Sequence, residues 1–214
     1  MADAVIEAIK KAIEGSKPLE RKFKQTLDLA INLKEIDLKN PKNRMDENIL
    51  LPKGRGKAVK VGAFGAGEFA MKAKKAADYV ILPADIDNYA ANKKQFKKIA
   101  SECKYFIAEA NLMVPIGKKL GAILAVRGKM PMPYPSNIDP AAIINNLKNT
   151  VKVKTPKDSP VIHVAVGTEE MSPEDIAANI HAVIERVEKK LERGKHNVRS
   201  IHIKTTMGPD VRLR

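Results

Sequence analysis

The chain has 214 residues, of which 39 are Lys or Arg and 25 are Asp or Glu, so its net charge is +14. This excess of cations favours a polyanionic partner, nucleic acid first and an acidic membrane surface second. Cys103 is the single cysteine, which excludes an intrachain disulfide and a zinc site built on several cysteines. Aromatic residues make up only 4% of the chain, so we expect an aliphatic core.

Neither a membrane span nor a secretory signal is indicated. No stretch approaches the roughly 20 apolar residues that a membrane helix needs. The segment that begins at Met1 lacks a basic region followed by an apolar run. We therefore expect a cytoplasmic protein with no membrane partner.

The first 57 residues predict one helix and two strands. Apolar residues recur at helical spacing from Val5 to Ile13, and Gly15 ends this helix. Alternation then predicts a strand from Phe23 to Asn32. The remaining segments are a polar loop at 37–48 with a turn at Asn40 and Pro41, a short strand at 49–52, and a basic, flexible linker at 53–57.

Between residues 58 and 150, strands alternate with helices. This order predicts a parallel sheet that is covered by helices on both faces. The expected strands are 59–64, 79–82 and 106–108, and the expected helices are 68–77, 93–103, 114–120 and 140–147. The proline-rich segment 128–135 is predicted to be an irregular loop.

The last third predicts three strands and one long helix. The strands are 151–154, 161–166 and 198–205, with a turn at 156–158 between the first two. Ser172 followed by Pro173, Glu174 and Asp175 is a strong helix start, because the serine caps and the acids face the positive end of the dipole. We expect this helix to continue to about residue 193 and to end at Gly194.

Neither terminal segment alone would bury much apolar surface. Together they supply two helices and an antiparallel sheet, which is a split β-α-β (ferredoxin-like) arrangement. We therefore expect an α/β protein of two domains: residues 1–57 and 151–214 form the split domain, and residues 58–150 form an inserted Rossmann-like domain with a parallel sheet.

A nucleotide-dependent enzyme is one alternative. The segment from Gly65 to Ala70 follows a strand and opens a helix, as a dinucleotide-binding turn does, and Asp85 lies 18 positions after Gly67. Tight strand-to-helix turns favour glycine in any case, and Glu68 would repel a pyrophosphate. The four histidines, at 163, 181, 196 and 202, lack metal-ligand spacing, although His163 and His202 could pair across a sheet. We expect no enzyme activity and no cofactor.

RNA binding has better candidate residues. Arg21 and Lys22 precede Phe23, which combines cations for phosphate with a ring for stacking, although Phe23 could equally belong to the core. The segment from Thr205 to Pro209 offers two hydroxyl groups and a glycine that permits close approach of RNA. By composition alone this segment is a polar turn. Nonspecific nucleic-acid binding is a further alternative.

Three motifs in order resemble the archaeal branch of the ribosomal protein L-one family, the stalk proteins of the large ribosomal subunit. These motifs are Arg21-Lys22-Phe23-Lys24-Gln25-Thr26, Gly128-Lys129-Met130-Pro131 and Thr205-Thr206-Met207-Gly208-Pro209 with Val211-Arg212. The resemblance covers nearly the whole chain. It implies a split terminal domain, an inserted Rossmann-like domain, and binding to large-subunit rRNA near the exit site for tRNA. It also implies repression of the chain's own mRNA, contact with exit-site tRNA, and a monomer when free.

The resemblance also implies which residues face RNA. The RNA-binding residues carried onto this chain are Lys22, Phe23, Thr26, Asp28, Thr205, Thr206, Met207 and Gly208. Two positions depart from the family pattern: Asp28 stands where the family often has Glu, and Asp210 stands where Ser is common.

Overall fold

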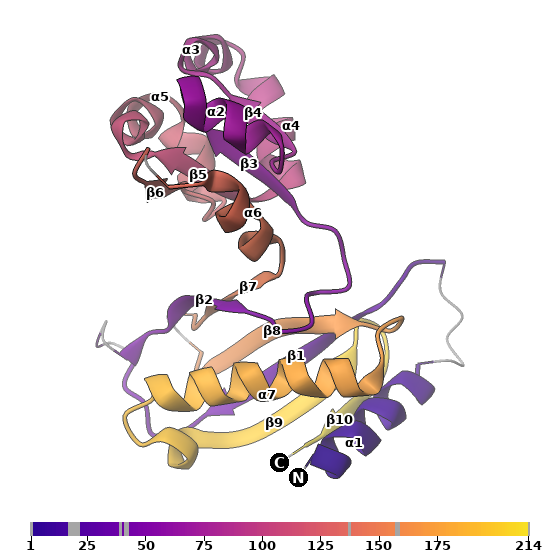
Figure 1. Cartoon of the computed structure of the whole chain (residues 1–214). Coiled ribbons are helices and arrows are strands. Elements are labelled where there is room, and N and C mark those ends of the chain that lie inside the picture. The colour runs from indigo at the N-terminus through magenta and orange to yellow at the C-terminus, as the bar shows by residue number, and fades with distance from the viewer. Residues whose placement is uncertain are drawn as a thin grey trace. The chain divides into compact units, whose positions relative to one another are not determined.

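The computed structural model describes residues 2–16, 22–38, 40, 43–136, 138–156 and 159–213. Arg21, Pro41, Lys157 and Asp158, which carry parts of the predictions above, lie outside these ranges. The chain divides into two compact units, Met1–Lys57 with Asn149–Arg214, and Ala58–Lys148 (Figure 1). We call them unit 1 and unit 2.

Unit 1 contains a four-stranded antiparallel sheet in the order β10-β9-β1-β8. Its strands are β1 (Thr26–Leu33), β8 (Val161–Thr168), β9 (Val198–Thr205) and β10 (Asp210–Arg212), and its helices are α1 (Ala2–Glu14) and α7 (Pro173–Lys190). Because β1 lies between β8 and β9, it splits the β8-α7-β9 unit, as the predicted fold requires.

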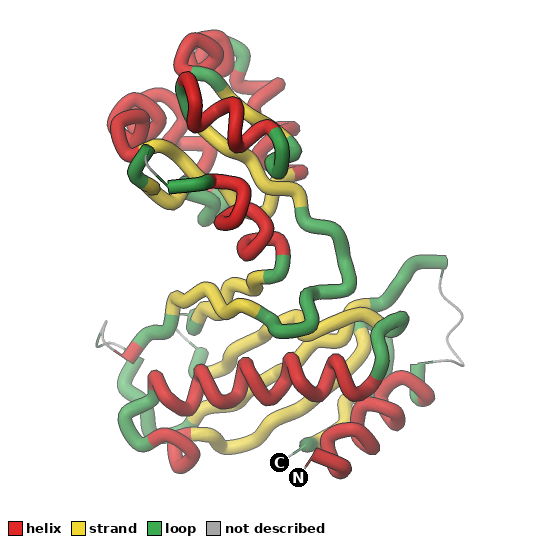
Figure 2. Tube along the Cα trace, viewed as in Figure 1, coloured by secondary structure: helices red, strands yellow, loops and turns green. Residues whose placement is uncertain are grey.

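Both helices of unit 1 pack on the same face of this sheet (Figure 2). The alternation of β1 explains why, because Leu27, Leu29 and Ile31 are buried in the core with apolar residues of α1 and α7. Thr26, Asp28, Ala30 and Asn32 point to the other face and stay partly exposed. We call this second face, with the neighbouring positions of β8, β9 and β10, the open sheet face.

The start of α7 has the predicted cap. The Ser172 Oγ accepts a hydrogen bond from the Asp175 N–H (3.1 Å), with Pro173 in the first turn. The helix ends at Lys190, earlier than predicted, and a short 3-10 helix follows at Gly194–Asn197. Unit 1 also has a two-stranded antiparallel sheet of β2 (Asp46–Leu50) and β7 (Thr150–Lys154), so the segment predicted as a loop at 37–48 already pairs from Asp46.

Unit 2 has an entirely parallel sheet in the order β4-β3-β5-β6. Its strands are β3 (Lys60–Phe64), β4 (Tyr79–Ile81), β5 (Cys103–Glu109) and β6 (Met132–Tyr134). One face packs against α2 (Gly67–Lys74) and α6 (Pro140–Lys148), and the other against α3 (Pro83–Ala91), α4 (Lys93–Glu102) and α5 (Met113–Val126), which a 3-10 turn at Ala110–Leu112 precedes. The predicted Rossmann-like arrangement is therefore present.

Two elements of unit 2 differ from the sequence predictions. The helix α3 was not predicted, because Ile86 is its one buried residue and gives no apolar stripe. The segment 128–135 is not wholly irregular, since β6 pairs with β5 and places Pro133 opposite Ala108. Proline is tolerated there because β6 is an edge strand. In the described part of the chain, no helix has the length and apolarity that crossing a bilayer requires.

Candidate nucleic-acid interface

Two segments that lie 180 residues apart in the sequence meet at one end of the unit 1 sheet. The Thr206 N–H donates to the Thr26 carbonyl oxygen (3.0 Å). The Thr206 hydroxyl donates to the same carbonyl (3.2 Å) and accepts from the Thr26 N–H (3.2 Å). The Met207 N–H donates to the Gln25 side-chain oxygen (3.2 Å). The predicted loop and the predicted strand start thus form one continuous edge, which we call the sheet-end surface (residues 22–26 and 205–209).

Acidic residues hold the other side of the segment 22–26. The Glu169 carboxylate accepts from the Gln25 N–H (3.0 Å), and the Glu169 N–H donates to the Gln25 carbonyl (3.2 Å). Lys24 forms an ion pair with Glu170 (2.8 Å). Glu169 and Glu170 therefore anchor the chain before β1. Sequence reasoning missed both roles and missed Gln25, because nothing in the local pattern links residues 144 positions apart.

Two large apolar side chains of this surface remain in solvent. Phe23 is 50% exposed and Met207 is 49% exposed. The strand β1 begins at Thr26, not at Phe23, because the carboxylate and the N–H of Glu169 occupy the backbone N–H and carbonyl of Gln25. Phe23 is therefore not a core residue in this structure. Lys22 beside it is also exposed.

Thr205 differs from the expectation from sequence, and Gly208 has a packing role that the sequence did not predict. Thr205 is fully buried, and its Oγ1 has no hydrogen-bond partner among the described residues. It is therefore not the exposed hydroxyl that the sequence suggested. A Cβ added to Gly208 would lie 2.2 Å from Thr205 Oγ1 and 3.1 Å from Ser16 Cβ, so glycine is required by packing. A Cβ added to Gly15 would likewise meet Pro209 at 2.9 Å, so the loop is wedged against the end of α1.

Asp28 lies on the open sheet face, two residues after Thr26. It pairs with Lys204 on β9 and with Ala165 on β8. Partial burial raises the pKa of the Asp28 carboxyl, and the charges of Lys204 and His163 oppose this shift. The carboxylate is thus a half-buried acceptor beside Lys204 and His163.

The histidines do not form the pair that the sequence allowed. His163 and His202 both lie opposite Ala30, one on each side of β1, so a whole strand separates them. The His202 Nδ1 instead lies 3.2 Å from an Asp210 carboxylate oxygen, and its Nε2 lies 3.2 Å from Ser200 Oγ. Asp210 therefore has an imidazole partner within the sheet. The described residues contain no cluster of His, Cys, Asp and Glu that could hold a metal ion.

The segment expected to be a flexible linker is partly fixed to unit 1. Asn179 of α7 is fully buried; its side chain accepts from the Lys53 N–H (3.1 Å) and donates to the Gly54 carbonyl (2.8 Å). A Cβ at Gly56 would lie 2.5 Å from Thr168 Oγ1, so this glycine also packs closely.

The glycine-rich turn of unit 2 has a protein carboxylate where a dinucleotide phosphate would sit. The turn at Gly65–Gly67 joins β3 to α2, next to the end of β5, which is the crossover point of this strand order. There the Ala66 N–H donates to the Glu109 carboxylate (3.3 Å), and Glu68 adds a second acid in the first helical turn. Two carboxylates at the N-terminus of α2 disfavour an anionic ligand.

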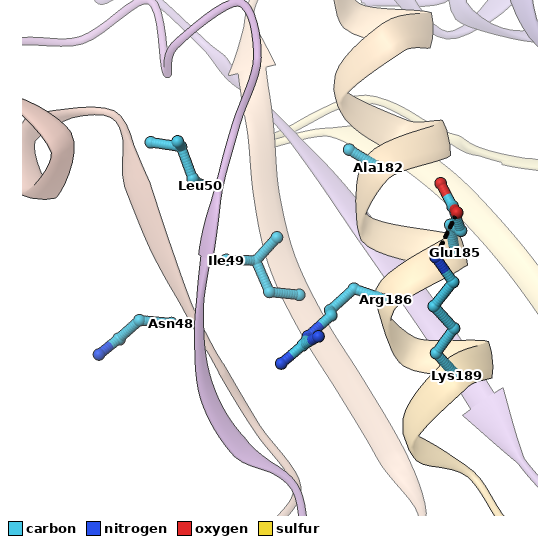
Figure 3. Close-up of a pocket in the computed structure, with 7 residues that line it drawn as sticks. All are labelled: Asn48, Ile49, Leu50, Ala182, Glu185, Arg186 and Lys189. Carbon is cyan, nitrogen blue, oxygen red and sulfur yellow. Dashed lines mark hydrogen bonds and ion pairs between the residues drawn. The ribbon is translucent and has the colours of Figure 1, made fainter.

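A groove of about 370 Å³ lies between β2 and α7 of unit 1 and shares no lining residue with the sheet-end surface (Figure 3). Its cations are already paired: Arg186 with Glu47 (2.9 Å) and Lys189 with Glu185 (2.6 Å). Lys190 is the second partner of Glu47 (3.0 Å), and these cations hold the pKa of the Glu47 carboxyl below its usual value. This groove therefore offers little free positive charge to a polyanion.

Comparison with known proteins decides between the alternatives. The model of the Ribosomal protein L1p/L10e family matches residues 8–209. The chain belongs to this family. It is 51% identical over 209 residues to the large ribosomal subunit protein uL1 of Methanocella arvoryzae, covering 97% of both chains. It is 50% identical to the uL1 of Thermoplasma volcanium over 97% of this chain and 96% of that protein, and 44% identical over the full length of both chains to the uL1 of Methanothermobacter thermautotrophicus.

Membership in a family of ribosomal proteins confirms that the chain is not an enzyme.

The structure also explains part of the middle family motif, Gly128-Lys129-Met130-Pro131. The Lys129 ammonium donates to the carbonyl oxygens of Ala100 (2.7 Å) and Cys103 (2.7 Å) at the end of α4. Gly128 before it has a φ of +63°, which favours glycine. In this structure the motif is a helix C-cap within unit 2.

Proposed function

We propose that this chain binds large-subunit rRNA through the sheet-end surface of unit 1 and forms the mobile stalk near the tRNA exit site. The observation that carries the proposal is the hydrogen-bonded union of Thr26 and Thr206, which presents Phe23 and Met207 together at one exposed edge. Residues 1–57 and 151–214 are then the RNA-binding domain. A protein of the ribosome works in the cytoplasm, which is the location expected from the sequence.

The exposed groups of this surface suit a folded RNA. Phe23 offers a face for stacking on a base or packing on a ribose, and Lys22 offers a cation to phosphate. The Thr206 hydroxyl already donates to and accepts from Thr26, which leaves one lone pair for a ribose 2′-OH. The Asp28 carboxylate can accept from a base amine or a 2′-OH. Within this surface, Thr205 and Gly208 pack closely and fix the shape of the loop.

The same surface supports two further partners. An mRNA that folds like the rRNA site would compete for the same groups, so the chain would repress translation of its own message. Exit-site tRNA would meet the stalk once rRNA has positioned it. Since the proposed contacts come from a single copy of the chain, we expect the free protein to be a monomer.

Binding of a large-subunit rRNA fragment tests the proposal. Met207→Asp places a charge on the exposed edge, and Phe23→Ala removes the ring; each should weaken binding on the order of 10- to 100-fold. Lys10→Gln on the exposed side of α1 is the matched control and should change binding less than about threefold. Equal losses in all three variants would reject a specific surface.

Competition separates specific from nonspecific binding. Excess unrelated RNA should fail to displace the rRNA fragment, since specific sites exceed nonspecific ones by several orders of magnitude. If unrelated RNA displaced the rRNA fragment at equal concentration, binding would be nonspecific and due to the basic surface alone. The same assay with a fragment of the chain's own mRNA tests repression by mimicry.

A further inference from the structure

The helix α4 lies in unit 2 (Figure 1). Its sequence carries four lysines and one acid, which is an unusual arrangement of charge. Phe96 and Ala100 are fully buried, which turns one face of α4 toward the core. Lys93, Lys94, Lys97 and Lys98 are all exposed on the remaining surface. At 3.6 residues per turn these four side chains span an arc of about 140°. We call this arc the α4 patch.

The lysines of the α4 patch have no local compensation. In the ranges that the structure describes, none of the four forms an ion pair, whereas Lys11, Lys72 and Lys189 on other helices each pair with an acid one turn away. The one acid of α4, Glu102, is engaged by the Lys60 ammonium (2.8 Å) and the Tyr79 hydroxyl (2.7 Å).

This arrangement also opposes the stability of α4 itself. Lys93 with Lys97, and Lys94 with Lys98, are like-charge pairs four residues apart. Lys93 and Lys94 lie in the first turn, where the helix dipole is positive and acids are favoured; the first turn of α4 has no acid. A cationic arrangement that works against its own helix is explained by a polyanion that binds there.

A fifth cation extends the patch from a different element. Arg127, which follows α5, donates to Ser101 Oγ (3.4 Å), and Ser101 lies one turn after Lys97 and Lys98. Arg127 is exposed and forms no ion pair in the described part of the chain. Two helices thus converge on one positively charged surface.

We propose that the α4 patch with Arg127 is a second RNA-binding surface, which holds the phosphate backbone of duplex RNA without sequence preference. The patch offers charge but no stacking platform, because the ring of Phe96 is buried, so it suits paired RNA rather than unstacked bases. It lies on unit 2 and shares no residue with the sheet-end surface. The inference therefore goes beyond the proposed function, and the two can fail independently.

The test compares two variants of the full chain with the same change in net charge. The patch variant is Lys93→Gln, Lys94→Gln, Lys97→Gln and Lys98→Gln. The control variant is Lys72→Gln, Lys74→Gln, Lys75→Gln and Lys119→Gln, which also lies on unit 2 but outside the α4 patch. Binding to a short RNA duplex of unrelated sequence is measured by fluorescence anisotropy over a series of salt concentrations.

The patch variant should bind the duplex on the order of 10- to 100-fold more weakly near 0.1 M salt. The slope of log K against log salt should become shallower by about 0.9 for each phosphate that the variant no longer neutralises. The control should bind the duplex less than about threefold more weakly than the parent. Thermal unfolding of the patch variant at the same or a higher temperature than the parent would show that α4 still folds, since glutamine favours helices and removes the repulsion.

Three results would overturn the inference. Equal losses in the two variants would assign the effect to net charge alone. Unchanged duplex binding by the patch variant would show that the α4 patch does not bind duplex RNA. Loss of binding to anionic lipid vesicles but not to RNA would assign the patch to a membrane surface. Met207→Asp should leave duplex binding intact while weakening the rRNA fragment, so failure at one surface is visible separately from failure at the other.

Discussion

Replacing Gly208 by Ala puts a methyl group where unit 1 has no room for it. The added Cβ would lie 2.2 Å from Thr205 Oγ1 and 3.1 Å from Ser16 Cβ, and both of these residues are buried. Overpacking of a filled site costs about 1–3 kcal/mol. We therefore expect Gly208→Ala to destabilise the protein by about 2 kcal/mol and to displace Met207 from its place beside Gln25.

The structure also identifies a compensating change. Thr205 Oγ1 has no hydrogen-bond partner among the described residues, so Thr205→Ala should cost only about 1 kcal/mol for the lost methyl group. In the double variant the shortest contact disappears, because alanine lacks the Oγ1 atom. Additive effects would cost about 3 kcal/mol, whereas we expect about 1 kcal/mol, which is a coupling of about 2 kcal/mol.

Urea unfolding of the four proteins in this cycle measures the coupling, and binding of the rRNA fragment measures its effect on function. Gly208→Ala alone should reduce affinity on the order of tenfold, with recovery in the double variant. If Gly208→Ala were as stable as the parent, or if the two substitutions were additive, the close packing of this loop would be refuted.

Three further outcomes are expected. Lys129→Met should destabilise unit 2 by about 2 kcal/mol, because it removes charged hydrogen bonds to the carbonyls of Ala100 and Cys103; unchanged urea unfolding would contradict this capping role. Burial raises the pKa of the Cys103 thiol to about 12, so a thiol reagent at pH 8 should react only after unfolding, and rapid reaction of the native protein would refute the burial. Burial raises the pKa of Asp28 in the folded state, so its stabilising contribution is present below its ordinary value of 3.8 and is lost as pH rises through the raised value. Asp28→Asn should therefore be more stable than the parent at pH 7 and lack this part of the pH dependence, as unfolding at a series of pH values would show.

The sequence predicted those helices and strands whose own residues form a capping motif or a regular apolar pattern. The capped start of α7 follows from Ser172 and Pro173, and the alternation of β1 follows from Leu27, Leu29 and Ile31. The elements that were missed depend on partners elsewhere in the chain. The three-residue strand β10 exists because Asp210–Arg212 pairs with β9, and β6 exists because β5 offers it an edge.

Some features of the sheet-end surface were predicted from the sequence and others were not. The sequence predicted a strand that begins at Phe23 and another that ends at Thr205, and it placed both in the split domain. It did not predict that Thr205 is buried or that His202 lies beside Asp210, because both depend on which way a side chain turns at a strand end. The anchoring by Glu169 was missed because it joins residues 144 positions apart in the sequence.

The position of β1 between β8 and β9 has a consequence for synthesis of the chain. Thr206 is added to the growing chain 180 residues after Thr26. The hydrogen bonds between these two residues therefore form only when synthesis is nearly finished. Until β8 and β9 are made, both edges of β1 lack their partners, and the sheet-end surface does not exist. An incomplete chain therefore lacks the RNA contacts that we propose for this surface, so under that proposal only completed molecules bind rRNA there.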